Sequence, residues 1–221
     1  MDYYTTAKKF ILKNSRPLDM ARWNYLFENG SKENVISALK AYQNDDGGFA
    51  NALEPDCWNI NSTPLQTWVA TQIIKEINLE DKTHPIIKGI LDYLSSKDEF
   101  DGHRLHGLNT VVTNDNYPHA PWWSYRQKQI KKVITYDTKI WSTDYICKPS
   151  LFINSKSSDF YLENKEICDF EYKFILKTQN EDGSWGVTWE WNDYPEQWSI
   201  SKNWWQSDII IKNIKYIREL N

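Results

Sequence analysis

Apolar side chains recur every three or four residues along most of the chain, a spacing typical of helices that bury one face. Pro17 and Pro64 fit first helical positions, Ser31 fits a helix cap, and Asn29-Gly30 fits a helix end. The predicted helices cover residues 18–27, 31–42, 63–77, 83–94, about 122–134, 142–153, 159–178 and 200–220. No stretch alternates convincingly as a strand would, so the sequence predicts an all-α chain of roughly eight or nine helices.

The connections between these helices are uneven in length. The segments 44–62, 98–121 and 185–199 are long, irregular and rich in Trp, Asn, Asp and Pro. Loops of this length in a compact fold are usually functional or disordered, and this composition favours ordered loops. No linker or break in composition divides the chain, so one domain over residues 1–221 is predicted.

A short motif occurs twice, each time after a predicted helix. Residues 38–49 read A-L-K-A-Y-Q-N-D-D-G-G-F, and residues 174–185 read F-I-L-K-T-Q-N-E-D-G-S-W. A weaker third copy, D-Y-L-S-S-K-D-E-F-D-G-H-R, begins at Asp92. Glutamine can bind backbone groups at a helix end, glycine permits a sharp reversal, and the aromatic ring can cover the junction. Self-similarity of this kind indicates a repeated structural unit, and we expect Gln43 and Gln179 to bind backbone there.

The motif resembles the QW repeat of terpenoid cyclases and the related repeat of protein prenyltransferases and squalene cyclases. This resemblance implies an α/α toroid, in which helical hairpins form two concentric rings. A full toroid has six hairpins, whereas this chain supplies about four or five, so the ring is expected to be open or incomplete. Helices at an open end would expose apolar faces, which leads us to expect a homodimer slightly more often than a monomer.

The motifs that carry chemistry in this superfamily are not intact here. The only candidate for an Asp-x-Asp-Asp acid, Asn44-Asp45-Asp46, belongs to the repeat, and no Asp-Asp-x-x-Asp run is present. Asp56-Cys57 lacks the spacing of the zinc ligands in protein prenyltransferases. Phosphate-binding and nucleophile motifs are also missing. We therefore predict no metal and no cofactor.

Composition narrows the partners and the location. The chain has 26 Lys and Arg against 30 Asp and Glu, a net charge of −4, and no basic block, so nucleic acid is not an expected partner. No apolar run approaches the ~20 residues of a membrane span, and the N-terminus lacks the apolar stretch of a secretory signal. Three cysteines without close spacing fit a reduced, cytoplasmic protein.

The loop after the first repeat offers two candidate acid/base groups. Glu54 and Asp56 flank Pro55 in G-G-F-A-N-A-L-E-P-D-C-W, so both carboxylates can face one cavity. The alternative is that one of them binds backbone N–H groups at the start of the next helix. If both lie against tryptophan rings, at least one should have a pKa above its ordinary value.

A histidine forms the third catalytic candidate. His119 lies between two prolines in N-Y-P-H-A-P-W-W, and Trp122 and Trp123 follow it. A structural histidine is the alternative, but this setting suits a pocket. The two loops together resemble a group of uncharacterised bacterial proteins with toroid-type repeats, which carries no known reaction.

Aromatic residues, with 12 Trp and 13 Tyr, exceed what a core requires. The loop V-T-W-E-W-N-D-Y-P-E-Q-W interleaves rings with Glu190, Asp193 and Glu196, a combination suited to carbohydrate, although it could also clamp the last helix. The candidate substrate-binding residues are Trp58, Tyr117, Trp122, Trp123, Trp189 and Trp191.

Two functions therefore stay open at this point. The chain is either an enzyme that acts on a carbohydrate or isoprenoid-like small molecule in an aromatic, acidic cleft, or a non-catalytic module that binds a ligand or a protein there. We expect Glu54, Asp56 and His119 to share one cavity in either case.

Overall fold

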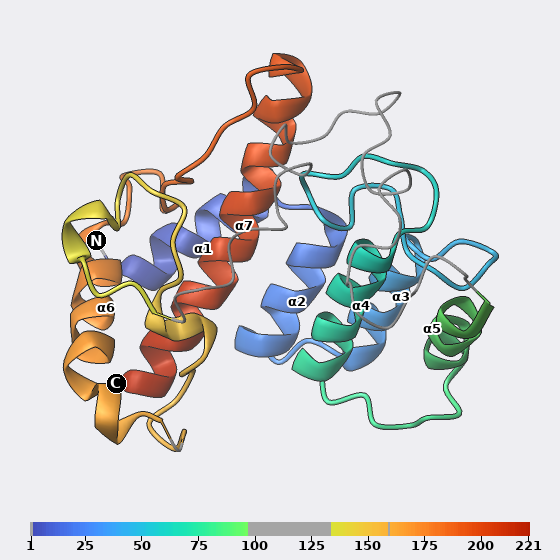
Figure 1. The fold of residues 1–221 in the computed structure, drawn as a ribbon, viewed down its shortest axis with the longest axis horizontal. Helices are drawn as coiled ribbons and strands as arrows, with labels where there is room; N and C mark the ends of the chain where they lie inside the picture. The colour runs from blue at the N-terminus through green and yellow to red at the C-terminus, as the bar shows by residue number, and fades with distance from the viewer. Residues whose placement is uncertain (1, 97–133, 159) are drawn as a thin grey trace. The chain divides into compact units, whose positions relative to one another are not determined.

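The computed structural model describes residues 2–96, 134–158 and 160–221, and within them the chain forms helices joined by turns and loops (Figure 1). The α-helices are α1 (Tyr3–Asn14), α2 (Pro17–Phe27), α3 (Lys32–Lys40), α4 (Pro64–Glu76), α5 (Pro85–Ser96), α6 (Lys165–Lys177) and α7 (Pro195–Leu220). These residues contain no strand, only isolated bridges that join Phe49 to Gln43 and to Thr63. The predicted all-α fold is confirmed at this level.

The helix α1 is absent from the sequence-based prediction. Asp2 caps it by accepting a hydrogen bond from the backbone N–H of Tyr4 at 3.3 Å. Its buried face consists of two pairs four residues apart, Thr6 with Ala7 and Phe10 with Ile11. Two of these four side chains are small or polar, so the apolar stripe is weak in the sequence although the face is buried.

Two later helices differ from their predicted bounds, and one prediction is wrong. Residues 142–153 do not form a helix; this part of the chain has only the short 3₁₀ turns η2 (Thr138–Ile140) and η3 (Pro149–Leu151). Pro149 would clash with the carbonyl four residues earlier in a continuous helix. The helix predicted at 159–178 begins later, at Lys165 after the turn η4 (Leu162–Asn164), whereas α7 begins earlier, at Pro195. The predicted helix at 122–134 lies almost entirely outside the described residues.

The described residues divide into two compact units. Unit 1 consists of residues 2–19, 134–190 and 202–221, and unit 2 of residues 20–96 and 191–201. Two of the boundaries between the units fall inside helices, after Asp19 in α2 and after Ser201 in α7. One domain over the whole chain stays a prediction.

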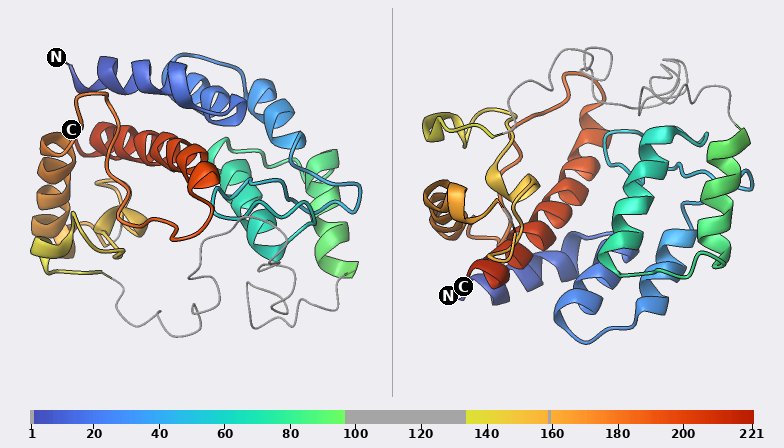
Figure 2. Two further views of the ribbon diagram at one scale, coloured as in Figure 1. Left: turned by 90° about the horizontal axis from the view of Figure 1, so that it is seen from above. Right: turned by 60° about the horizontal axis from the view of Figure 1, so that its bottom comes forward.

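In unit 1, α7 lies beside α1 and α6 (Figures 1 and 2). The guanidinium of Arg218 on α7 lies 5.0 Å from the ring centre of Tyr4 on α1. The hydroxyl of Tyr216 donates to the carbonyl of Cys168 on α6 at 3.4 Å. Apolar side chains from all three helices form the core of this unit: Phe10, Ile11, Cys168, Ile175, Ile210, Ile211 and Ile214.

In unit 2, polar contacts tie α2 to α4. Arg22 and Glu76 form a largely buried ion pair, with Nε and Oε2 2.8 Å apart. The hydroxyl of Tyr25 donates to the carbonyl of Ile77, the residue that ends α4, at 3.2 Å. The apolar core of the unit is contributed by all of its helices: Trp23, Val35, Leu39, Ile73, Ile86 and Tyr93.

The two strong copies of the repeat form the same turn. Gln43 Nε2 donates to the carbonyls of Gly47 at 2.8 Å and Ile86 at 3.1 Å. Gln179 Nε2 donates to the carbonyls of Gly183 at 3.1 Å and Tyr3 at 2.9 Å. The prediction that both glutamines bind backbone at a helix junction is confirmed. The acceptors, however, lie in the turn itself and in the first turn of another helix, not at the end of the preceding one.

The aromatic residue that closes each copy is buried. Phe49 is completely buried, and Trp185 donates from Nε1 to the carbonyl of Ile175 at 2.8 Å, which satisfies a group near the end of α6. The weak third copy extends past residue 96 and lies mostly outside the described residues.

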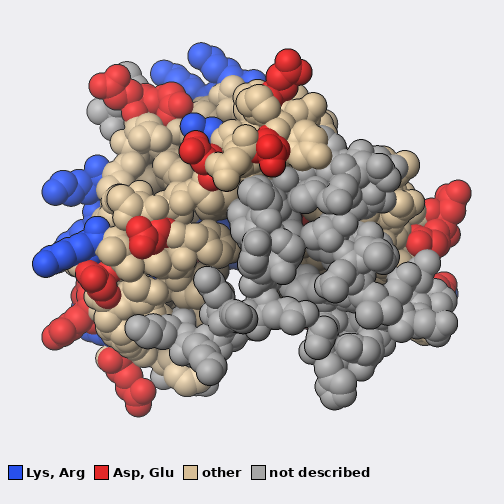
Figure 3. All heavy atoms as spheres, turned by 45° about the horizontal axis from the view of Figure 1, so that its top comes forward, with Lys and Arg blue, Asp and Glu red and all other residues tan. Residues whose placement is uncertain are grey.

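Acidic and basic side chains are interspersed on the face drawn in Figure 3, in keeping with the small net charge. Among the residues that the structure describes, no helix combines the length and apolar character needed to cross a bilayer.

Candidate functional site

Four of the predicted site residues belong to unit 2 and lie on two segments. Glu54, Asp56 and Trp58 belong to the loop between α3 and α4, and Trp191 precedes α7. Tyr117, His119, Trp122 and Trp123 lie outside the described residues, so the expected convergence of His119 with the carboxylates stays a prediction.

The loop at residues 50–62 is closed by its own backbone and is largely buried. The N–H of Asn51 donates to the carbonyl of Asn59 at 2.9 Å, and the N–H of Cys57 donates to the carbonyl of Glu54 at 3.0 Å. Residues 52–57 are all buried. Loops usually run over the surface because buried backbone groups need partners, so this burial requires further donors and acceptors.

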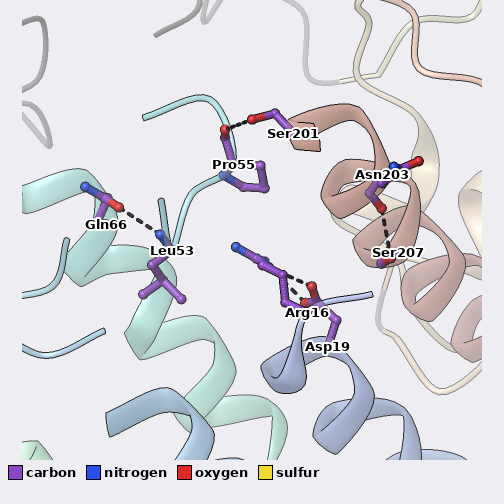
Figure 4. Close-up of polar contacts among 8 residues, drawn as sticks. All are labelled: Arg16, Asp19, Leu53, Pro55, Gln66, Ser201, Asn203 and Ser207. Carbon is purple, nitrogen blue, oxygen red and sulfur yellow. Dashed lines mark hydrogen bonds and ion pairs between the residues drawn. The ribbon is translucent and has the colours of Figure 1, made fainter. Parts of the chain in front are cut away.

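Gln66, completely buried in the first turns of α4, supplies one donor and one acceptor. Its Oε1 accepts from the N–H of Leu53 at 2.9 Å (Figure 4). Its Nε2 lies 3.5 Å from the thiol sulfur of Cys57. Thr63 caps the same helix by accepting from the N–H of Gln66 at 3.1 Å. One side chain therefore holds both ends of the stretch that carries Glu54 and Asp56.

Both carboxylates are buried, with 5 % of Glu54 and 0 % of Asp56 exposed. Glu54 Oε2 accepts from the backbone N–H of Asp56 at 3.0 Å. Asp56 Oδ1 accepts from the indole Nε1 of Trp191 at 3.0 Å. Glu54 thus does bind a backbone N–H, but within the loop; the start of α4 is capped by Thr63.

The first turns of α7 hold the proline between the two carboxylates. Ser201 Oγ donates to the carbonyl of Pro55 at 2.7 Å (Figure 4) and accepts from the indole Nε1 of Trp58 at 2.8 Å. The same indole also lies 3.2 Å from the Pro55 carbonyl. Ser201 is completely buried. Neither Ser201 nor Gln66 lies in a sequence motif, and only their partners far along the chain reveal their roles.

Aromatic side chains pack around Trp191, whose indole binds Asp56. Leu65 and Trp191 form a small buried cluster, against which Trp58, Tyr194 and Trp198 pack. The ring centres of Trp191 and Trp198 are 5.5 Å apart. The site therefore joins carboxylates, indole N–H groups and flat apolar faces, the groups that a small ligand with both polar and apolar surfaces would contact.

The backbone on both segments adopts a conformation that side chains disfavour. Ala52 has φ 60° and Tyr194 has φ 56°, in the left-handed region. Asn29 and Asn78 share this conformation, but asparagine tolerates it just after a helix. Left-handed residues other than glycine and asparagine gather at functional sites, where the surrounding structure holds them in place.

The pKa of the Cys57 thiol reflects the burial of the loop. Burial, with the nearby charge of Glu54, raises the pKa of the Cys57 thiol to about 12. Because the thiolate is the reactive form, Cys57 does not serve as a nucleophile near neutral pH. No group of three or more His, Cys, Asp or Glu side chains in the described residues has the arrangement of a metal site.

Trp189, also predicted to bind substrate, belongs to unit 1. Its ring packs edge-on against Tyr145 at 5.4 Å and Trp205 at 5.1 Å between ring centres. Glu190, Asp193 and Glu196 are all exposed. No protein-family model, curated protein or solved structure matches this chain.

Proposed function

We propose that the loop of Glu54 and Asp56 is the active site of an enzyme that acts on a carbohydrate or isoprenoid-like small molecule. The main observation that supports this proposal is the pair of buried carboxylates, two residues apart, beside the indoles of Trp58 and Trp191. Buried acids packed against aromatic rings are common where proton transfer is catalysed, because poorly solvated carboxyl groups exchange protons with a substrate more readily.

Glu54 and Asp56 would share the acid and base roles, one carboxyl group giving a proton to the leaving oxygen and the other accepting one. The indole of Trp191 holds Asp56 in one orientation through its Nε1. Ser201 and Trp58 bind the carbonyl of Pro55, which lies between the two acids in the chain. These hydrogen bonds hold the backbone that sets the spacing of the Glu54 and Asp56 side chains. Preorganisation of this kind reduces the reorganisation that a reaction needs.

A carbohydrate is the favoured substrate class. Sugar hydroxyls pair with carboxylates and indole N–H groups, and the faces of sugar rings stack on Trp side chains. An isoprenoid-like chain would pack against the same rings, but the two buried carboxylates would act on it only by protonating a double bond or an epoxide.

The test combines binding with turnover. The protein is incubated with a panel of oligosaccharides and with isoprenyl alcohols and diphosphates; binding is followed by thermal shift, and products by mass spectrometry. Glu54→Gln and Asp56→Asn should each lower turnover about 100-fold or more, while substrate still shifts the melting temperature. Glu80→Gln, at an exposed acid that lies after α4 and outside both site segments, is the control. Turnover that survives both buried-site substitutions would reject the proposal.

The second candidate, a non-catalytic binding module, is favoured by the partners that the carboxylates already have. Glu54 binds the N–H of Asp56, and Asp56 binds Trp191, as orienting groups in a binding site would. A ligand that raises the melting temperature of the wild type without any product, and raises it less in Glu54→Gln, would identify this function.

The toroid arrangement and a homodimer form part of the same proposal. Two copies of one turn, each bound to the first turn of another helix, support a fold built from repeated helical hairpins. A crystal structure would test the ring, and light scattering would test the dimer: a mass near 26.3 kDa, that of one chain, at micromolar concentration would contradict it.

A further inference from the structure

Unit 1 carries a second group of titratable side chains that the proposed function does not use. Its frame is the segment that precedes α6, where the N–H of Thr135 donates to the carbonyl of Cys147 at 2.9 Å. Trp141 lies inside this segment, completely buried, and donates from Nε1 to the carbonyl of Thr135 at 3.0 Å. Lys148 follows Cys147 directly, so these hydrogen bonds hold the backbone that carries the lysine.

The amine of Lys148 lies over aromatic rings. Its Nζ is 4.9 Å from the ring centre of Phe174 on α6 and 5.9 Å from that of Trp141. These two rings contact each other edge-on at 5.6 Å. The side chain is half-buried, and the two rings form apolar walls beside the amine.

A buried carboxyl group lies near this amine. Glu171 is 1 % exposed and accepts two hydrogen bonds from Ser150, at 2.6 Å from Oγ and at 2.8 Å from the backbone N–H. The other titratable groups around it are Tyr216 from α7 and Cys168 from α6. Within the described residues Lys148 makes no ion pair with Glu171.

Both groups are shifted toward their neutral forms. Burial lowers the pKa of the Lys148 amine, and the charge of Glu171 opposes this shift. Burial raises the pKa of Glu171, against the hydrogen bonds from Ser150 and the charge of Lys148. A neutral amine is a nucleophile, and a neutral carboxyl group can donate a proton.

From the aromatic walls, the half-buried amine and the neighbouring carboxyl group, we propose that Lys148 forms an imine with an aldehyde or ketone that has an apolar or aromatic body. The amine nitrogen attacks the carbonyl carbon, and the carbonyl oxygen takes a proton from the Glu171 carboxyl group. The nitrogen returns a proton to Glu171, which gives a neutral carbinolamine. The hydroxyl group then leaves as water with a proton from Glu171, and the imine nitrogen gives one back. The sum is amine plus carbonyl compound to imine plus water.

The competing explanation is structural. An ammonium group above two aromatic faces is stabilised by their electrons, and Lys148 would then only cover the apolar cluster of Trp141 and Phe174. The two explanations predict opposite reactivities, because an ammonium held by the rings reacts more slowly than an exposed lysine, whereas a desolvated amine reacts faster.

The experiment uses the full chain with benzaldehyde and sodium cyanoborohydride, which reduces an imine to a stable benzylamine. Peptide mass spectrometry then compares the lysines of the same molecules from neutral to alkaline pH. Lys139, exposed on the same segment, is the matched internal control. We expect Lys148 to be modified several-fold faster than Lys139 near neutral pH, and its rate to level off at a lower pH.

Two variants sharpen the result. Glu171→Gln keeps an acceptor for Ser150 but removes the acid, and should slow the modification of Lys148 while Lys139 is unchanged. Lys148→Met keeps the apolar stem and should abolish benzylation of that peptide. The comparison of Lys148 with Lys139 needs no variant, so it holds even if a substitution unfolds the protein. Modification of Lys148 no faster than that of Lys139 would overturn the proposal and support simple ring packing.

Discussion

The turns at residues 43–49 and 179–185 share their geometry but differ in what they hold. In each, the glutamine amide binds the glycine carbonyl four residues later and a carbonyl in the first turn of another helix. In each, the glycine adopts a positive φ, 85° at Gly47 and 92° at Gly183, and its backbone touches that same helix three residues further on, at Gly89 or Thr6. The repeat therefore binds the end of one helix to the start of another, at equivalent positions in both copies.

The difference lies at the position after this glycine. In the second turn, Ser184 Oγ donates to Asp182 at 2.7 Å and accepts from Asn180 at 3.0 Å, so the turn supplies its own hydroxyl group. The same oxygen also accepts from Nε2 of Gln206 on α7 at 3.0 Å. The first turn has Gly48 there, and both contacts are made by Ser62, with Asp46 at 2.7 Å and Asn44 at 3.0 Å.

The replacement is sterically required. A Cβ atom on Gly48 would lie 2.6 Å from the Cβ of Ser62 and 2.6 Å from the ring of Tyr93. The missing side chain thus makes room for a hydroxyl from the far end of the loop that carries Glu54 and Asp56. The second turn supplies its own hydroxyl and binds α7 through Gln206, whereas the first turn anchors the loop of the candidate site through Ser62.

The largest expected effect comes from the glycines that both turns share. A Cβ on Gly47 would lie 2.1 Å from the carbonyl oxygen of Gly89, and one on Gly183 would lie 2.1 Å from that of Thr6. Gly47→Ala and Gly183→Ala should each lower the free energy of unfolding by about 4 kcal/mol or more, since strain and clash add. Urea titration measures this. Gly186→Ala, where the new Cβ meets nothing within 4 Å, is the control and should stay near the wild type.

The glutamines should rank next, and unequally. Gln179→Ala leaves the carbonyls of Tyr3 and Gly183 and the hydroxyl of Thr6 without this partner, at a cost of about 1–3 kcal/mol. Among the described residues, the Oε1 of Gln43 in the first turn accepts only from Lys40, an exposed side chain that water can solvate instead. Gln43→Ala should therefore cost less than Gln179→Ala in urea unfolding; the reverse order would contradict the hydrogen-bond assignment.

The serine pair tests whether the first turn anchors the site loop. Ser62→Ala removes a buried hydroxyl with two partners and Ser184→Ala removes one with three, so each should cost about 1–2 kcal/mol or more. Only Ser62→Ala should increase hydrogen exchange at residues 50–62. Equal exchange of this loop in the two variants would show that Ser62 is a local staple like Ser184.

The sequence predicted the turns well because their chemistry is local: glutamine, glycine and an aromatic residue at fixed spacing. It also placed Glu54 and Asp56 on one loop, but it gave no sign of Gln66 or Ser201, whose contacts with Leu53 and Pro55 depend on tertiary packing. Ser62 illustrates the same limit, because its role follows from a side chain that Gly48 lacks. The helix α1 was missed for another reason, since Thr6 and Ala7 are buried without being strongly apolar.

The smallest expected effect concerns a stretch of strained backbone that follows the first turn but not the second. After Phe49 the chain passes through Asn51 and Ala52, both at φ 60°, before it reaches Glu54. In Ala52→Gly the left-handed conformation loses its steric penalty, while the unfolded chain gains freedom, so the unfolding free energy should rise by no more than about 1 kcal/mol. Calorimetry measures this as a small increase in melting temperature. Because Asn51 already tolerates its conformation, Asn51→Gly should change stability less. A lower stability for Ala52→Gly than for the wild type would instead show that the Ala52 methyl group packs favourably enough to outweigh the strain.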